Sequence, residues 1–302
     1  MVERKTLMLI DFNNVFYSHY YGKPIFNSKG QNIHGIQGFI FRMKNLREMF
    51  NPDYIVLARD VSRIKTFRRE LYSEYKNNRK PTDNDFIFQS SAALRIFSLM
   101  GYPILGHERY EADDIIGMCS LLADELNMDT IIVSADKDLY QLISPHTSIF
   151  SFKVGELIDM TYMNDVYKLT PSQWVDLKIL QGDKSDNIPG IQSIGHKTAL
   201  ALMQGFGSIA NIYQHLDRLS DSMRNKFELG KADIPLTRTL VTIIRDYKLL
   251  DITEKTFERS EMFVNELFNE LAELELAAVV NTIRYNLMPI TINNPDNFVM
   301  SY

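Results

Sequence analysis

Nine acidic residues of this chain fall in short clusters or at single positions, most of them directly after apolar, strand-like runs. They are Asp11, Asp60, Glu111, Asp113, Asp114, Asp136, Asp138, Asp183 and Asp186. Carboxylates at the ends of neighbouring strands come close together, and like charges at short range resist ionising unless a cation neutralises them. Mg²⁺ prefers such oxygen ligands. The pattern predicts a site for two metal ions against a phosphate, and hence hydrolysis or transfer of a phosphodiester.

The first 150 residues alternate strand-like with helix-like runs. Residues 6–10, 54–58, 102–105, 130–134 and 148–152 are strand-like; residues 35–50, 86–100, 111–126 and 137–143 are helix-like. This alternation predicts an α/β fold with a mostly parallel sheet and helices on both faces. Ligands of such sheets bind beyond the carboxyl ends of the strands, where the acidic residues fall.

From Thr170 onward the pattern is helical. Pro171 after Thr170 is a helix-start signal, and residues 172–180, 197–203, 208–216, 220–229 and 234–246 have helical character. Residues 261–285 form an acidic amphipathic helix or a pair of helices, and we expect the polar stretch 289–302 to fray.

The charge distribution favours nucleic acid more than the net charge of −5 does. Of 38 acidic residues, nine belong to the pattern above, which leaves 29 against 33 basic ones. Residues 59–80 alone hold eight basic residues and three acidic ones, and local basic density is what binds phosphate. The single cysteine, Cys119, lies in an apolar helical stretch and suits a reducing interior. We expect no signal peptide and no membrane span.

Each acidic cluster also has an ordinary structural interpretation. Acids in the first turn of a helix stabilise its dipole, which would explain Glu111, Asp113 and Asp114. An N-cap would explain one of Asp136 and Asp138, but not both. Asp183 and Asp186 could form a polar turn. The joint occurrence is what favours a metal site.

Two further motifs suggest contacts with a nucleic acid. Residues 190–199 read as a hairpin of two helices in which Gly195 precedes a helix start that can bind phosphate, with Lys197 beside it. Tyr72, Tyr75, Lys76, Arg79 and Lys80 interleave aromatic and basic side chains, as in surfaces that stack bases and hold phosphates. A plain helix turn and a solvated basic helix face remain the alternatives.

Several of these motifs, in this order and spacing, resemble one known family. The most specific are Tyr110-Glu-Ala-Asp-Asp-Ile-Ile-Gly117, Ser134-Ala-Asp-Lys-Asp-Leu139, and Gly182-Asp-Lys-Ser-Asp-Asn-Ile-Pro-Gly190 followed by Ile194-Gly195-His-Lys-Thr-Ala199. Leu9-Ile-Asp11, Asn27-Ser-Lys-Gly30 and Tyr75-Lys-Asn-Asn-Arg79 support them. From about residue 6 to about residue 250 the chain resembles the 5′-nuclease (flap endonuclease) superfamily, in particular the N-terminal 5′→3′ exonuclease domain of bacterial DNA polymerase I and free-standing phage 5′ nucleases.

The resemblance implies a role for each of these residues. Asp11, Asp60, Glu111, Asp113, Asp136 and Asp138 would be the core metal ligands, and Asp114, Asp183 and Asp186 would complete the second metal and its water shell. Lys76 and Arg79 would contact the scissile phosphate from a helical arch, with Tyr75 and Lys80 beside them and Tyr75 as a stacking platform. Gly190, Ser193, Gly195, Lys197 and Thr198 would grip duplex DNA in a helix–three-turn–helix.

The resemblance also implies cofactors, partners and a division into domains. Two or more divalent ions are expected, Mg²⁺ with Mn²⁺ as a substitute, and K⁺ at the helix–three-turn–helix. The partners would be DNA with 5′ flaps, nicks or ends, RNA–DNA hybrids and replication proteins. The protein would act as a monomer in the cytoplasm of a bacterium or a phage-infected cell. Its role would be in replication, repair or primer removal. Residues 1–169 would form the PIN-like nuclease core with an arch at about 60–100. Residues 170–250 would bind DNA, and residues 251–302 would add C-terminal helices and a tail.

Three departures from the family pattern leave other functions open. Ser18 stands where an arginine is usual, Arg59 precedes the second aspartate where an apolar residue is usual, and Ser193 replaces a glycine. They motivate the alternative of a structure-specific DNA-binding protein that has lost catalysis. A third hypothesis is a ribonuclease of the related metal-dependent fold, against which the duplex-gripping hairpin argues.

Overall fold

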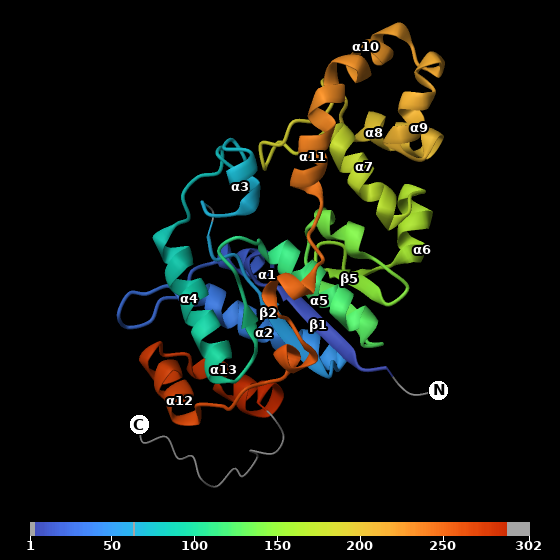
Figure 1. Cartoon of the computed structure of the whole chain (residues 1–302). Coiled ribbons are helices and arrows are strands. Elements are labelled where there is room, and N and C mark those ends of the chain that lie inside the picture. The colour runs from blue at the N-terminus through green and yellow to red at the C-terminus, as the bar shows by residue number, and fades with distance from the viewer. Residues whose placement is uncertain (1–3, 63, 289–302) are drawn as a thin grey trace.

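A six-stranded sheet forms the centre of the protein. The computed structural model describes residues 4–62 and 64–288 (Figure 1). The strands are β1 (Thr6–Asp11), β2 (Tyr54–Ala58), β3 (Ile104–Leu105), β4 (Asp129–Val133), β5 (Thr147–Ser151) and β6 (Glu156–Ile158). They lie in the order β3-β2-β1-β4-β5-β6, with all neighbours parallel except the antiparallel pair β5–β6. The predicted mostly parallel α/β sheet is therefore confirmed.

Alternate residues of the strands serve two separate cores, one on each face of the sheet. Leu7 and Leu9 of β1 face one core, and Met8 and Ile10 face the other. This two-residue period follows from the pleat of a strand. Because both faces are buried, the central strands read as unbroken apolar runs, which is why they could be recognised in the sequence.

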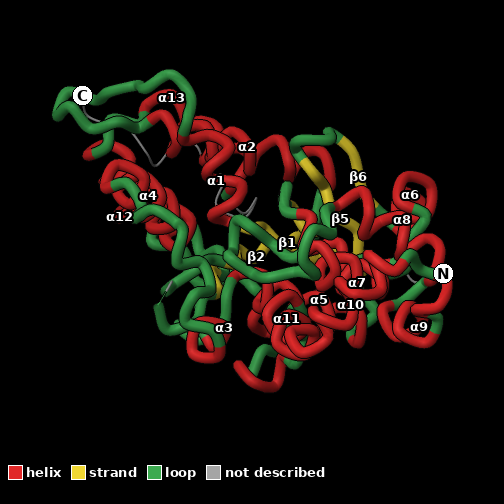
Figure 2. The backbone as a smooth tube through the Cα atoms, turned by 90° about the horizontal axis from the view of Figure 1, so that it is seen from above, coloured by secondary structure: helices red, strands yellow, loops and turns green. Residues whose placement is uncertain are grey.

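Helices cover both faces, as Figure 2 shows from above. The face of Leu9 packs against α5 (Ala112–Glu125), the 3₁₀ helix η1 (Lys137–Leu142) and α7 (Pro171–Gln181). The opposite face packs against α1 (Phe12–Tyr20), α2 (His34–Phe50), α4 (Asn84–Leu99), α12 (Val264–Glu273), α13 (Ala277–Thr282) and η7 (Ile283–Leu287). Cys119 and Trp174 lie buried in the first of these cores.

A helical part extends from one end of the sheet (Figure 1). The link α6 (Met160–Tyr162) and η2 (Met163–Tyr167) leads into α7, and there follow α8 (His196–Phe206), α9 (Ile209–Gln214), η3 (Leu216–Arg218), α10 (Asp221–Gly230), η4 (Lys231–Asp233) and α11 (Ile234–Val241). The chain then returns through η5 (Tyr247–Leu250) and η6 (Glu254–Phe257) to α12 and α13 at the far side of the sheet.

Some elements differ from the sequence-based expectation. The third strand is only Ile104–Leu105, residues 137–142 form a 3₁₀ helix, and β6 was not anticipated. Among the described residues of the expected helical arch, only the five of α3 (Phe67–Leu71) are helical before α4 begins at Asn84; turns and a bend fill residues 73–79. The expectation for residues 289–302 falls outside the described residues. None of the described helices has the length and apolar character that crossing a bilayer requires.

Candidate active site

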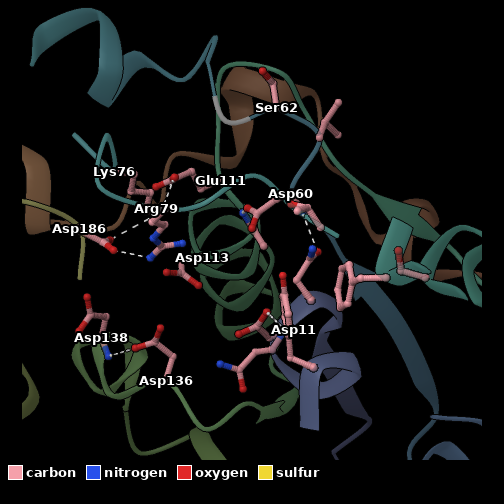
Figure 3. A pocket seen from close by; sticks show the side chains of 18 of the residues that line it. Asp11, Asp60, Ser62, Lys76, Arg79, Glu111, Asp113, Asp136, Asp138 and Asp186 are labelled. Carbon is pink, nitrogen blue, oxygen red and sulfur yellow. Dashed lines mark hydrogen bonds and ion pairs between the residues drawn. The ribbon is translucent and has the colours of Figure 1, made fainter. Parts of the chain in front are cut away.

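A cavity of about 490 Å³ opens at the carboxyl ends of β1, β2 and β4 (Figure 3). Two cationic side chains, Lys76 and Arg79, line it together with seven carboxylates: Asp11, Asp60, Glu111, Asp113, Asp136, Asp138 and Asp186. The strand register explains the convergence, because Asp11 pairs with Ala58 of β2 and Ile10 with Val133 of β4. The three strands thus end at one edge, where the acids that follow them meet.

Asp11 is the most deeply buried of these acids, with 5% of its surface exposed. The Ser134 hydroxyl donates to its carboxylate at 2.7 Å, and the Asn14 amide donates at 3.3 Å as the cap of α1. Burial nevertheless raises the pKa of Asp11 to about 7; the Ser134 hydrogen bond opposes this rise, and repulsion from Asp136 and Asp60 adds to it. Asp113 has its pKa raised well above the usual range by burial and by Asp136 and Asp11. Added positive charge nearby would favour the ionised form of such carboxylates.

The metal-free protein is therefore expected to lose stability as the pH rises from about 4 to about 7. The pKa of an unfolded Asp is about 3.9, whereas that of folded Asp11 is about 7. Between these values the folded state binds more protons than the unfolded state, so raising the pH favours unfolding, by on the order of 4 kcal/mol from Asp11 alone. Melting temperatures in EDTA from pH 5 to 8 test this. Asp11→Asn should flatten the curve, and a melting temperature that rises across this range would contradict it.

Glu111 is held by two cationic side chains and a tyrosine hydroxyl. The Lys76 ammonium lies 2.5 Å from its carboxylate, the Tyr75 hydroxyl donates to it at 2.7 Å, and Arg68 lies at 3.3 Å. Burial alone would raise its pKa, but the charges of Lys76 and Arg68 hold the pKa of Glu111 below its usual range. Glu111 is thus ionised and already neutralised by protein cations.

Asp60, Asp136 and Asp138 are fixed by backbone and lysine contacts. Asp60 accepts a hydrogen bond from the Ala112 amide at 2.9 Å, which joins the end of β2 to the start of α5. Asp136 caps η1 through the Asp138 amide at 2.9 Å, so the N-cap interpretation and the position in the cavity both hold for it. Burial raises the pKa of Asp138 to about 6, although Lys178 at 2.6 Å opposes this.

Lys178 is a site residue that the sequence reasoning missed. It is buried, and its ammonium bridges Asp138 and Asp183, each at 2.6 Å. A signal was present in the sequence, since Lys178 interrupts an apolar helix between Leu177 and Ile179. Asn13 and Asn14, directly after Asp11, were also missed; both line the cavity, and they accept hydrogen bonds from the Asp60 and Ala135 amides.

In this structure Asp114 lies apart from the cavity, although the resemblance implies a metal role for it. Its side chain is fully buried, outside the cavity, and both of its oxygens accept from the Arg68 guanidinium at 2.6 and 2.7 Å. The amides of Ile244 and Glu111 donate to it as well. With its acceptor sites filled by protein donors, Asp114 is a structural anchor. Asp183 also lies outside the cavity lining, where Lys178 and Ser185 hold its carboxylate.

Tyr75 is likewise not the expected stacking platform. Only 3% of its surface is exposed, and it packs in the core next to α5. Its hydroxyl positions Glu111 instead. Lys76 and Arg79 do reach the cavity, and Lys80 is exposed beside them.

The residues expected to grip duplex DNA lie in the turn before α8 or in its first turn, away from the cavity lining. They are Gly190, Ser193, Gly195, Lys197 and Thr198. Ser193 has φ +60°, the left-handed conformation that glycine prefers, at the position where the family pattern has glycine. A Cβ on Gly195 would meet no atom within 4 Å, whereas one on Gly190 would collide with the Gly182 backbone. The space beside Gly195 is thus open, and Gly190 serves close packing.

Of the other departures, Ser18 donates its hydroxyl to the Val15 carbonyl of its own helix at 2.6 Å. Beside it, Arg42 donates to His19, whose pKa burial lowers to about 4. Arg59 lines a separate groove with His107 and Arg109. Neither Ser18 nor Arg59 disturbs a carboxylate of the cavity.

The chemistry of the cavity fits hard divalent cations. Its acidic groups all offer oxygen ligands, and the Asp113 carboxylate has no hydrogen-bond or ion-pair partner in the described part of the chain. Among residues 4–62 and 64–288, no three His, Cys, Asp or Glu side chains gather closely enough to hold one ion alone. This wider spacing suits an ion such as Mg²⁺, which keeps several waters and binds through one or two carboxylates.

Comparison with protein families agrees with this geometry. The family model described as 5′-3′ exonuclease, N-terminal resolvase-like domain, matches residues 6–169, and the model of the 5′-3′ exonuclease C-terminal SAM fold matches residues 169–265. Among relatives, the thermostable DNA polymerase I of Thermus filiformis is 33% identical over 279 residues, which cover 92% of this chain and 33% of the polymerase. DNA polymerase I of Streptococcus pneumoniae is 37% identical over 252 residues, 80% of this chain and 29% of the polymerase. The chain thus spans about a third of the length of these relatives.

Solved structures share the fold. The zinc-bound T5 5′-exonuclease superposes with a TM-score of 0.69 at 19% identity, covering 89% of this chain and 99% of its own. The bacteriophage T5 D15 flap endonuclease in complex with DNA and metal ions has a TM-score of 0.66 at 18% identity, with the same coverage. Human GEN1 in complex with Holliday junction DNA has a TM-score of 0.57 at 16% identity, covering 89% of this chain and 68% of its own.

Proposed function

The chain belongs to the 5′-3′ exonuclease family, and from this premise we propose that it is a structure-specific, divalent-metal-dependent 5′ nuclease. Its substrates would be phosphodiesters near the 5′ ends, nicks and flaps of DNA. The observation that carries the proposal is the cavity in which seven carboxylates from separate elements converge with Lys76 and Arg79. The carboxylates can bind metal ions, and the two cationic side chains can contact a phosphate. Hydrolysis of a phosphodiester uses both kinds of contact.

Asp11, Asp60, Glu111, Asp113, Asp136 and Asp138 would hold the divalent ions, Mg²⁺ or Mn²⁺, with Asp186 and Asp183 contributing from the loop after α7. The chemistry that such ions supply is activation of water and neutralisation of charge on the phosphate. Asp11 and Asp113 are buried and repelled by neighbouring acids, so bound cations would make the ionised forms of these carboxyl groups more favourable. This edge of the sheet would therefore attract cations, because they stabilise its ionised carboxylates.

Lys76 and Arg79 would bind the scissile phosphate. Without ligands they pair with Glu111 and Asp186 across the cavity. Divalent ions compete with these two side chains for the same carboxylates, so metal binding would free the cations for phosphate. This exchange explains how one cavity can carry both signs of charge and still receive an anionic substrate.

The turn before α8 would grip the duplex. The exposed backbone at Gly195 opens a helix whose first amides can bind a phosphate, and Lys197 is exposed beside it. We further propose that main-chain carbonyls in this turn hold K⁺. The protein would act as a monomer in a bacterial or phage-infected cell. Its substrates would include RNA primers in RNA–DNA hybrids, and its partners would include replication proteins.

The decisive experiment is cleavage of a 5′-labelled flap duplex by the purified protein with Mg²⁺ and with EDTA. Release of a labelled fragment cut near the junction, only with Mg²⁺, is the expected result. A blunt duplex and a single strand of the same sequence should be cut far more slowly. Tight flap binding without cleavage in Mg²⁺ or Mn²⁺ would overturn the proposal in favour of a DNA-binding protein, and faster cleavage of an RNA strand than of DNA would favour a ribonuclease.

A further inference from the structure

Two segments far apart in sequence dock onto each other at the rim of the cavity. The arch segment, residues 74–79, meets the acidic loop, residues 183–187. The Lys76 amide donates to the Asp186 carbonyl at 2.8 Å. The side-chain amide of Asn78 donates to the Lys184 carbonyl, and that of Asn187 donates to the Glu74 carbonyl, each at 2.8 Å. These three hydrogen bonds run in both directions between the segments, so the arch segment is tied down at three successive points.

Charged contacts strengthen the same junction. Arg79 forms an ion pair with the Asp186 carboxylate, and the Lys76 ammonium lies 3.6 Å from it. Figure 3 shows Lys76 and Arg79 directed toward Asp186 and Glu111 at one wall of the cavity. Ligands that neutralise Asp186 would weaken these ion pairs, whereas the hydrogen bonds of Asn78 and Asn187 to main-chain carbonyls do not depend on that charge.

The docked backbone has an unusual conformation. Lys76 has φ +55° and Asn187 has φ +56°. Residues other than glycine enter this left-handed region at a cost, and they stay there when surrounding contacts hold them. The Lys76 backbone donates to the Asp186 carbonyl across the junction, and its own carbonyl accepts from the Arg79 amide at 3.2 Å. A change of this φ would redirect the lysine side chain away from Glu111.

The acidic loop is itself a fixed support. Its ends close on each other through two hydrogen bonds between Asp183 and Ile188, at 2.7 and 2.9 Å. The backbones of Gly182 and Gly190, which flank it, are so close that a Cβ on either would overlap the other. The loop thus joins α7 rigidly to the turn that precedes α8.

We propose that Asn78 and Asn187 are positioning residues for the nuclease reaction. By hydrogen-bonding the arch segment to the acidic loop, they fix the left-handed backbone of Lys76 and so aim Lys76 and Arg79 into the cavity. Their effect on turnover rests on the proposed function, in which these two cations bind the scissile phosphate. The docking itself does not, and it can be measured without substrate or metal.

The first test is hydrogen–deuterium exchange of the Lys76 amide in the DNA-free protein. Asn187→Gly removes the side-chain donor but accepts φ +56° without strain, and Asn78→Ala removes the donor on the opposite segment. Each should speed exchange about threefold to tenfold, the range expected for one lost hydrogen bond. Asn77→Ala is the matched control, because the side chain of Asn77 contacts Arg69 of α3 and Glu74 and does not reach the acidic loop; exchange of the Lys76 amide in this variant should equal that of the wild type.

The second test is single-turnover cleavage of the flap duplex. Asn187→Gly and Asn78→Ala should lower the cleavage rate about tenfold to a hundredfold, as misplacement of a reacting group does. Their affinity for the flap duplex should be unchanged. The Asn77→Ala control should cleave at the wild-type rate. Unchanged Lys76 exchange in both variants would overturn the docking, and faster exchange with a wild-type rate would overturn the positioning role. If the wild-type protein itself does not cut, the proposed function fails, and the exchange result still decides whether the two segments dock.

Discussion

Replacing Asp136 and Asp138 together by asparagine is expected to lower flap cleavage by about a thousandfold or more, a loss of at least about 4 kcal/mol in transition-state stabilisation. Both side chains line the cavity from the turn after β4, where Asp136 lies close enough to Asp11 to raise its pKa and Asp138 pairs with Lys178. Asparagine keeps the shape and one oxygen, but it removes the charge that draws in a divalent ion. Binding of the flap should change by no more than a few fold.

Folding should survive this double substitution. The side-chain oxygen of an asparagine at position 136 can still accept from the amide that Asp136 now caps, and Lys178 retains its ion pair with Asp183. The matched control is Asp165→Asn with Asp217→Asn, which removes the same charge at two exposed positions outside the cavity. Cleavage rates and melting temperatures of both pairs are compared in Mg²⁺. Near-normal cleavage by the Asp136/Asp138 variant would show that the ions bind elsewhere.

Much of the site was readable in the sequence because of a rule about sheets. Parallel strands end at one edge, so Asp11, Asp60 and Asp136, each at or shortly after the end of an apolar run, had to converge. The burial of the sheet on both faces follows from the same unbroken runs. The strand β6 escaped because its three residues carry little pattern, and its antiparallel pairing depends on the turn at Gly155.

What the sequence could not supply was the direction of each side chain. Asp113 and Asp114 are neighbours in α5, so their side chains point about 100° apart, since a helix has about 3.6 residues per turn. One faces the cavity and the other faces Arg68, a residue 46 positions away. Tyr75 was misread for a similar reason: an aromatic residue among basic ones indicates a stacking surface, but its partner Glu111 lies 36 positions on and holds it inside.

The second large effect concerns Asp114 and is one of stability. Asp114→Asn is expected to reduce the free energy of unfolding by about 3–5 kcal/mol, the cost of leaving one partner of a buried pair without its counter-charge. The partner left behind is Arg68, which is 3% exposed, donates to the carbonyls of Leu240 and Thr242, and would keep as counter-charge only the Glu111 carboxylate at 3.3 Å. Arg68 joins α3, the start of α5 and the C-terminal end of α11, so loss of its ion pair with Asp114 would loosen the contacts among three elements. Urea unfolding of the metal-free protein measures the change.

Asp113→Asn is the matched control, and the two substitutions should have opposite effects on stability and on cleavage. Burial and the nearby acids make the Asp113 carboxylate unfavourable in the metal-free protein, so removing it should leave stability unchanged or raise it, while flap cleavage falls sharply. Asp114→Asn should lower stability yet, at a temperature where the variant is folded, retain most of its cleavage. Adding Arg68→Met to Asp114→Asn should cost less than the sum of the two single changes, because the unpaired charge is then gone. If Asp114→Asn instead abolished Mg²⁺-dependent cleavage without loss of stability, the carboxylate would be serving the metal ions after all, and its pairing with Arg68 would have to open when they bind.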